Sequence, residues 1–240
     1  MARRRFFVPE VRRGTAELTG PDAEHLVRVL RAAPGQIYEL SDNRDVYVAE
    51  IETARKSVVA FRVIEKFDPP PASVQVTLIA ALIKFDSLEW LIEKATELGI
   101  STIQPVEAAR SERGLAQAAA KRLARWERIA LEASQQSRRA RLPRIEAPVR
   151  LVKTLQPDAN VRLLLDESST APPILSCLPQ ARLPADRVAL LLGPEGGWTD
   201  QEREEAIASD WVSCSLSHTI LRAETAGIAA TAIIQAAWRS

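Results

Sequence analysis

Residues 190–202 read LLLGPEGGWTDQE, an apolar run followed by a glycine-rich turn and by residues that favour a helix start. The apolar run predicts a strand buried on both faces. Thr199 and Glu202 have capping-box spacing, so a helix should begin just after the turn. The glycines of GPEGG (193–197) allow backbone amides to approach a ligand closely. A tight strand-to-helix connection without a ligand would use the same residues and is the alternative interpretation.

Apolar runs alternate with helical patterns from residue 74 to the end of the chain. One predicted helix ends before Gly99, one spans about 115–138, and the last spans 226–238. This alternation predicts an α/β fold with a mainly parallel sheet, which binds ligands beyond the carboxyl ends of its strands. The strands are expected at 74–80, 100–106, 161–166, 187–193 and 211–216.

The first 70 residues have a different pattern. Period-two alternation at 45–51 and 57–64 predicts an antiparallel mini-barrel, interrupted by one helix at 21–31. The segment DPPPA (68–72) breaks regular structure and indicates a domain boundary. We therefore expect a small β domain at 1–70 and the α/β domain at 73–240.

Basic residues concentrate in one part of the chain. Residues 110–150, which we call the basic belt, hold 11 Lys and Arg against 4 Glu, although the whole chain has a net charge of +1. A second small cluster is RRR (3–5). Such clusters attract phosphates and release counterions, which favours a nucleic-acid partner. A solvated helix face explains the belt equally well.

Several functional classes lack support in the sequence. Neither GxxxxGK[ST] nor GxGxxG occurs, so kinase, ATPase and nicotinamide-dehydrogenase functions are disfavoured. Cys177 and Cys214 belong to no CxxC pattern, which indicates neither a disulfide framework nor a zinc site. The start MARRRFFVPE lacks an apolar stretch, and the apolar runs are too short to span a bilayer, so we expect a cytosolic protein.

A second informative segment is LSHTILRAETAGIAA (216–230), which leaves a strand, turns and enters the last helix. That helix is apolar on almost every side, so it should be buried or packed against a second subunit. Arg222, Glu224 and Thr225 lie together at its start, where the helix dipole favours an acidic group. A structural Arg222–Glu224 pair is the alternative to a catalytic role.

These two segments resemble the SPOUT class of methyltransferases. More closely, GPEGG followed by ILRAETA (220–226) is similar to the RsmE family, which methylates N3 of a uridine in small-subunit 16S ribosomal RNA. The similarity extends to RRFFVP (4–9), KATELG (94–99) and RWERIALEASQQSRR (125–139). It therefore covers nearly the whole chain.

The resemblance implies a PUA-like β-barrel followed by a trefoil-knotted domain, a homodimer without a metal, and S-adenosylmethionine as the methyl donor. The partner would be 16S ribosomal RNA or the small ribosomal subunit. The knot would bring the turn at 193–197 against 216–226. The residues that would surround the cofactor are Leu165, Leu192, Gly193, Gly197, Leu216, Ser217, Ile220 and Leu221.

The segment departs from the family pattern LGxRILRTET at three positions. Ser217 replaces the glycine, Thr219 the first arginine and Ala223 the first threonine. Arg222, Glu224 and Thr225 of the pattern are present.

For the reaction, Arg222 would stabilise charge on a uridine oxygen, and Glu224 or Glu195 would accept the N3 proton. Two alternatives to this function stay open.

A related knot enzyme could act on a ribose 2′-OH or another base, and a non-catalytic RNA-binding module of the ribosome would use the same barrel and belt. The residues expected to bind RNA are Arg3, Arg4, Arg5, Arg138 and Arg139.

Overall fold

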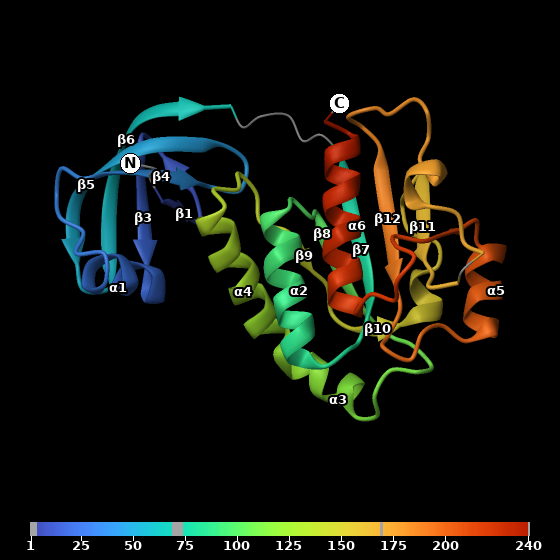
Figure 1. Cartoon of the computed structure of the whole chain (residues 1–240). Helices are drawn as coiled ribbons and strands as arrows, with labels where there is room; N and C mark the ends of the chain where they lie inside the picture. Colours follow the sequence, from blue (N-terminus) through green and yellow to red (C-terminus); the bar gives the residue numbers. More distant parts are fainter. Residues whose placement is uncertain (1–3, 69–73, 169, 240) are drawn as a thin grey trace. The chain divides into compact units, whose positions relative to one another are not determined.

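The computed structural model describes residues 4–68, 74–168 and 170–239. The chain divides into two compact units (Figure 1): unit 1 is Met1–Pro70 with Leu131–Leu142, and unit 2 is Pro71–Ala130 with Pro143–Ser240. The expected boundary at 68–72 lies, apart from Asp68, outside the described residues, as does Arg3. The limits 1–70 and 73–240 therefore stay a prediction.

Unit 1 contains a six-stranded sheet and the helix α1 (Gly20–Arg28). Strands at 45–51 and 57–64 were expected, and β5 and β6 lie there. The sheet is antiparallel except for the parallel pair β1–β4, which no local pattern could indicate because pairing depends on distant segments. In spatial order the strands are β1 (Arg5–Phe7), β4 (Ile37–Ser41), β5 (Val46–Arg55), β6 (Val58–Phe67), β3 (Thr15–Thr19) and β2 (Val11–Arg12).

The segment 131–142 belongs to unit 1 because hydrogen bonds attach it to the end of β4 and the following turn. Ser41 Oγ donates to the carbonyl of Ala140 at 2.6 Å, and the amide of Leu142 donates to Asn43 Oδ1 at 2.7 Å. Ser41 is fully buried. A buried hydroxyl that finds a carbonyl acceptor avoids the cost of an unpaired polar group.

Unit 2 is built on a parallel seven-stranded sheet, which confirms the expected α/β class with a mainly parallel sheet. The strands run in the order β10-β8-β7-β12-β11-β13, with β9 beside β8. Their bounds are β7 (Gln75–Ala81), β8 (Thr102–Glu107), β9 (Arg144–Ile145), β10 (Val149–Arg150), β11 (Val161–Leu165), β12 (Arg187–Leu192) and β13 (Val212–Cys214).

Two predicted helices have different limits in the structure. The helix expected over 115–138 is interrupted by a 3-10 turn and ends at Gln136, and Arg138 adopts a left-handed φ of 56° that a helix cannot accommodate. The last helix begins at Ala223, three residues earlier than expected. The helical elements after residue 74 are α2 (Phe85–Glu97), α3 (Leu115–Ala119), η1 (Ala120–Arg122), α4 (Leu123–Gln136), η2 (Leu151–Thr154), η3 (Ile174–Cys177), α5 (Asp200–Ala208) and α6 (Ala223–Ala237). None of the helices described here is long and apolar enough to cross a membrane.

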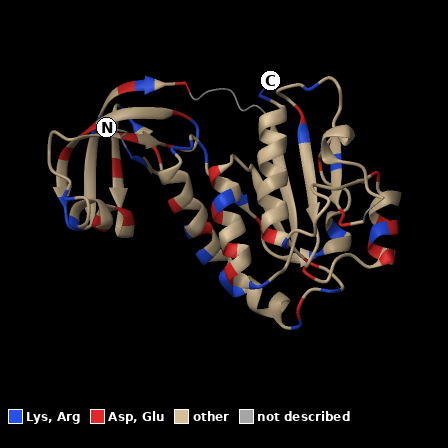
Figure 2. Cartoon of the chain, in the orientation of Figure 1, with Lys and Arg blue, Asp and Glu red and all other residues tan. Residues whose placement is uncertain are grey.

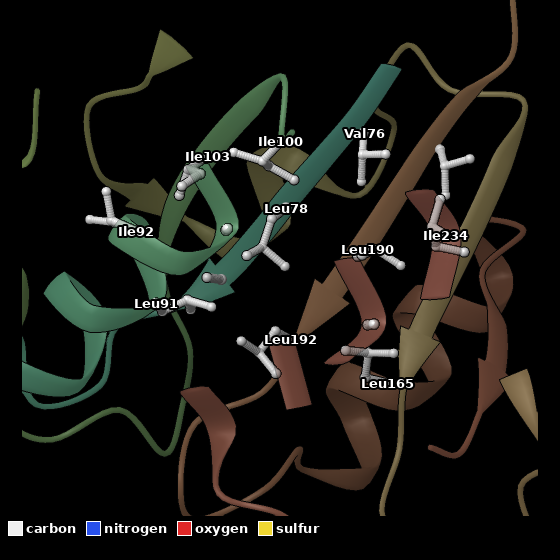
Figure 3. Close-up of a cluster of buried hydrophobic side chains, with 14 of the residues drawn as sticks. Val76, Leu78, Leu91, Ile92, Ile100, Ile103, Leu165, Leu190, Leu192 and Ile234 are labelled. Atoms are coloured by element: carbon white, nitrogen blue, oxygen red, sulfur yellow. The ribbon is translucent and has the colours of Figure 1, made fainter. Parts of the chain in front are cut away.

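Alternate strand residues face opposite sides of the sheet, and both sides are covered. Leu78, Leu190 and Leu165 lie on the side of α2 and α6, where Leu91 and Ile234 pack with them (Figure 3). The intervening residues contact η2, α5 and two buried tryptophans on the other side. Burial on both faces explains why these strands read as continuous apolar runs.

The position of α6 is fixed at both ends. At Gly227, an added Cβ would lie 2.8 Å from Leu91 Cδ1 and 3.0 Å from Leu192 Cδ2, so glycine lets α6 pack closely on α2 and β12. At the C-terminal end, the indole N–H of Trp238 donates to Asp186 Oδ2 at 2.9 Å. These contacts set where the first turn of α6, with Arg222 before it, meets the sheet.

We predict that Leu78→Ala lowers the free energy of unfolding by about 2–5 kcal/mol, because it leaves a cavity at the centre of the sheet. Urea denaturation measures this. Gln75→Ala, at the exposed start of the same strand, is the matched control and should cost less than about 0.5 kcal/mol. Equal losses for the two variants would contradict the assignment of Leu78 to the core.

Candidate functional site

A cavity of about 300 Å³ lies beyond the carboxyl ends of the adjacent strands β12, β11 and β13. The last residues of these strands, Leu192, Leu165 and Cys214, form its base. Its sides come from the turn after β12 and from the segment between β13 and α6. The expected meeting of 193–197 with 216–226 is therefore confirmed.

The structure brings most of the predicted site residues together around this cavity. All eight residues predicted to surround a cofactor line it, and so do Arg222 and Glu195. Glu224 is not among the lining residues. The lining residues that were not predicted include Asp166, Glu167, Trp198 and Arg203.

Two glycines of the turn after β12, Gly193 and Gly197, line the cavity and approach neighbouring side chains closely. An added Cβ at Gly193 would lie 3.0 Å from Cε2 of Trp198. At Gly197, where φ is 67°, it would lie 2.7 Å from Glu167 Oε1. The indole N–H of Trp198 donates to the carbonyl of Leu165 at 3.2 Å, which joins the turn to the end of β11. Close packing against Trp198 therefore requires glycine at 193, whereas at 197 glycine is favoured by the positive φ, because the Glu167 carboxylate can move.

The predicted capping box is present at the end of the turn. Thr199 Oγ1 accepts from the amide of Glu202 at 3.2 Å, and Glu202 Oε2 accepts from the amide of Thr199 at 3.0 Å. The box satisfies two backbone donors at the start of α5. It thereby fixes the direction in which the chain leaves the cavity.

A partly buried ion pair supports the wall formed by β11 and α5. Asp166 accepts from Arg203 Nε at 3.2 Å and from Ser213 Oγ at 3.2 Å. Arg203 also donates to the carbonyl of Trp198 at 3.0 Å. Sequence reasoning missed this pair because its two residues lie 37 positions apart; the only signal was an acid directly after a buried strand.

Arg222 and Glu224 occupy different environments at the start of α6. Arg222 is the exposed N-cap residue and lines the cavity. Glu224 is buried in the first turn, where the helix dipole favours a carboxylate. Within the described part of the chain, the carboxylate of Glu224 makes no hydrogen bond or ion pair, so the alternative of an Arg222–Glu224 pair is not seen in the structure.

The departures from the family pattern form a local turn. The hydroxyls of Ser217 and Thr219 lie 2.9 Å apart, and the amide of Thr219 donates to Ser217 Oγ at 3.1 Å. The next residue, Ile220, is 82% exposed and forms an apolar rim. The turn is therefore stabilised without the glycine and arginine of the pattern.

The cavity contains no activated thiol. Burial raises the pKa of Cys214 to about 12, and the neighbouring Cys177 and Asp166 act in the same direction. The Cys214 thiol therefore stays protonated at neutral pH and is a poor nucleophile. Among residues 4–68, 74–168 and 170–239, no group of three His, Cys, Asp or Glu side chains is suited to a metal.

In unit 1 the structure brings two of the predicted RNA-binding arginines together. Arg5 and Arg138 both donate to the carboxylate of Glu39, which leaves the three groups with a net positive charge. Arg4 lies over the ring of Phe6 and contacts His25. These arginines are thus held in place by neighbouring side chains.

Arg139 lies beside this cluster. Desolvation lowers the pKa of Arg139 to about 10, so its guanidinium remains charged at neutral pH. Its Nε donates to the carbonyl of Arg141 at 3.0 Å.

The part of the basic belt in unit 2 is also partly neutralised. Two arginines donate to the carboxylate of Glu89: Arg125 through Nε at 2.7 Å and Arg122 through Nη1 at 3.1 Å. Both arginines are substantially exposed. The hydrogen bond from Arg125 holds the pKa of Glu89 below its ordinary value, although burial acts in the opposite direction. Figure 2 shows both acidic and basic residues on α2 and α4. The belt retains positive charge, but less than the sequence count suggests.

Comparison with known proteins identifies the family. The RNA methyltransferase domain family matches residues 70–235. Ribosomal RNA small subunit methyltransferase E of Synechocystis is 35% identical, over 98% of this chain and 78% of the relative. The enzyme of the same name from Bacillus subtilis is 34% identical, over 92% of this chain and 89% of the relative.

Two solved structures agree with the whole fold. Ribosomal RNA small subunit methyltransferase E from Neisseria gonorrhoeae, bound to S-adenosyl methionine, is 29% identical with a TM-score of 0.86. A methyltransferase from Legionella pneumophila in complex with the same cofactor is 26% identical with a TM-score of 0.89. Each likeness covers 99% of this chain and 98% of the other. This chain therefore belongs to the family of RNA methyltransferases that includes the ribosomal RNA small subunit methyltransferase E proteins.

Proposed function

We propose that the chain is an S-adenosylmethionine-dependent methyltransferase that modifies N3 of a uridine in 16S ribosomal RNA. Family membership supports RNA methylation, and the relatives with bound S-adenosylmethionine support the cofactor. The single observation that carries the proposal is the glycine-walled cavity at the carboxyl ends of β11, β12 and β13. The target position follows from the resemblance of GPEGG and ILRAETA to the RsmE family.

The residues of the cavity fit this cofactor. The apolar side chains of Leu165, Leu192, Leu216 and Leu221 suit an adenine ring, and Gly193 brings backbone without a side chain to the cavity lining. When bound, S-adenosylmethionine supplies an electrophilic methyl group on a sulfonium.

The chain's own residues would prepare the uridine. N3 carries a proton between two carbonyls, and it must lose that proton before it attacks a methyl group. Arg222 would donate to the oxygen on which negative charge develops, because its guanidinium stays charged. Glu195, which lines the cavity, would accept the proton. The catalytic role predicted for Glu224 stays a prediction, because its carboxylate is buried outside the cavity lining.

We also propose the SPOUT trefoil knot for unit 2. In the sheet, β11 lies between β12 and β13, so β13 is at the edge. The next element, α6, packs on β7 and β12. The segment between β13 and α6 must therefore return past the end of β11. A bridge between Pro173 and Ser215 holds the connection after β11 alongside this returning segment. Such an arrangement supports threading of one segment through the other.

The remaining parts of the proposal concern assembly and partner. The six-stranded sheet of unit 1, within the proposed domain 1–70, would be a PUA-like RNA-binding barrel, and 73–240 would be the methyltransferase domain. The partly exposed apolar residues Ile228, Ala232 and Ile233 of α6 support a homodimer. The partner would be 16S ribosomal RNA or the small ribosomal subunit in the cytoplasm.

Mass mapping of modified nucleosides in ribosomal RNA tests the target. A strain that lacks this protein should lose one N3-methyluridine from 16S RNA, and the purified protein should restore it. Loss of a 2′-O-methyl group or of another methylated base would favour the related knot enzymes. Unchanged nucleosides, with no binding of S-adenosylmethionine, would favour a non-catalytic RNA-binding module.

We predict that Gly197→Ala weakens S-adenosylmethionine binding about tenfold, because the new Cβ displaces the carboxylate of Glu167, which also lines the cavity. Titration calorimetry measures this. Gly114→Ala is the matched control: Gly114 also has positive φ, at 87°, but its surroundings are open. Both variants carry the same kind of backbone strain, so equal affinities would contradict the placement of the cofactor at the turn.

We predict that Arg222→Ala lowers the methylation rate about 10²- to 10³-fold, as expected for the loss of one donor to a developing oxyanion. Calorimetry should give S-adenosylmethionine affinity within a few fold of the wild type. Single-turnover transfer to 16S RNA provides the rate. Full activity in this variant would refute the assignment of Arg222.

We predict that Arg138→Ala/Arg139→Ala weakens RNA binding and flattens its dependence on salt. Loss of two phosphate contacts should reduce the slope of log affinity against log salt by roughly 1.4–1.8. Lys153→Ala/Arg187→Ala in unit 2 removes the same charge and serves as the control. An unchanged slope in the first variant would favour a solvated helix face.

A further inference from the structure

The loop that follows β8 is bonded to the glycine turn of the cavity. Arg110 Nη1 donates to the carbonyl of Gly196 at 3.0 Å and to the carbonyl of Trp198 at 3.1 Å. The backbones are close here, since a Cβ at Gly196 would lie 3.2 Å from Cβ of Arg110. Arg110 is not among the residues that line the cavity, so any effect on a ligand there acts through the turn.

Together with backbone and capping-box bonds, these hydrogen bonds restrain two peptide groups of the turn. The carbonyl of Gly196 and the amide of Gly197 belong to one planar group; Arg110 holds the carbonyl, and the amide donates to Pro194 O at 2.9 Å. The carbonyl of Trp198 and the amide of Thr199 form the second group, in which the amide is held by the capping box. Each plane is therefore fixed on both sides. Arg110 is the side-chain donor that holds the Gly196 carbonyl, whereas the Trp198 carbonyl also accepts from Arg203 Nη1 at 3.0 Å.

A third bond anchors the loop itself. The amide of Ala109 donates to Glu202 Oε1 at 2.8 Å, while the other oxygen of Glu202 serves the capping box. Arg110 thus extends from a backbone that is already attached to the start of α5. A guanidinium held in this way can restrict the turn without contacting a ligand.

We propose that Arg110 is a positioning residue that presets the glycine turn for S-adenosylmethionine. The inference rests on the proposed function, in which the cavity binds this cofactor. Turns that are already ordered lose less conformational freedom on binding, so removal of the guanidinium lowers affinity. The chemical step depends on other groups and is preserved once the cofactor is bound.

The test compares Arg110→Met with Arg113→Met. Methionine keeps the aliphatic stem of Arg110 but donates no hydrogen bond. Arg113 is exposed in the same loop and, in the part of the chain that the structure describes, makes no hydrogen bond to the turn. Titration calorimetry gives the dissociation constant of S-adenosylmethionine. Steady-state methylation of 16S RNA gives kcat and the KM for the cofactor.

For Arg110→Met we expect about tenfold weaker binding and a matching rise in KM, with kcat within about twofold of the wild type. Arg113→Met should match the wild type, and Arg110→Lys should recover part of the affinity because its ammonium can donate hydrogen bonds again. A merely structural role would instead lower kcat and thermal stability together. Wild-type affinity in Arg110→Met, or equal loss in Arg113→Met, overturns the inference. Failure of the wild-type protein to bind S-adenosylmethionine would instead overturn the proposed function.

If Arg110→Met does not fold, Arg110→Lys alone decides. Lysine keeps the charge, but its ammonium is shorter in reach and sits on a more flexible stem than the planar guanidinium whose Nη1 makes both bonds. An unchanged cofactor KM in Arg110→Lys then contradicts the inference, and a raised KM with normal kcat supports it.

Discussion

The hydrogen bond from the Trp198 indole to the carbonyl of Leu165, with the ring packed against Gly193, joins the ends of two parallel strands. The rest of the cavity depends on this contact. It holds the turn after β12 across the end of β11, and it leaves a wall built from backbone and from apolar side chains. Because Trp198 is almost fully buried, the indole N–H would be costly to leave unpaired. The turn is therefore held where the cavity needs it.

The position of α6 and the ion pair between Asp166 and Arg203 also shape the site. Gly227 lets α6 lie close to α2 and β12, which brings Arg222 to the edge of the cavity. The ion pair between Asp166 and Arg203 supports the opposite wall. Most cavity residues thus contribute shape, and few contribute ionisable groups. This suits a reaction in which a bound cofactor supplies the electrophile and the protein supplies orientation.

Local sequence patterns predicted the elements of unit 2 well, because buried parallel strands must be apolar along their whole length. The capping box at Thr199 and Glu202 likewise indicated the start of α5. The order of the strands could not be read in this way, since parallel partners lie far apart in sequence. The early end of α4 was also hidden, because the left-handed conformation of Arg138 is not an intrinsic preference of arginine.

The residues of the candidate site show the same difference between local patterns and tertiary contacts. Those in recognisable motifs, such as Gly193, Gly197 and Arg222, can be identified from the amino-acid sequence alone. Arg110 and Asp166 act through tertiary hydrogen bonds that no spacing rule reveals. The charge pattern was informative but incomplete, because Glu39 and Glu89 neutralise part of the basic belt and its neighbours.

Hydrogen exchange with and without S-adenosylmethionine tests the central claim, that one ligand binds where the turn after β12 meets the segment before α6. The account predicts that added cofactor slows amide exchange in both 193–198 and 216–222, while the sheet of unit 1 is unaffected. Unchanged exchange in these two segments at saturating cofactor, or protection confined to another part of the chain, would contradict it.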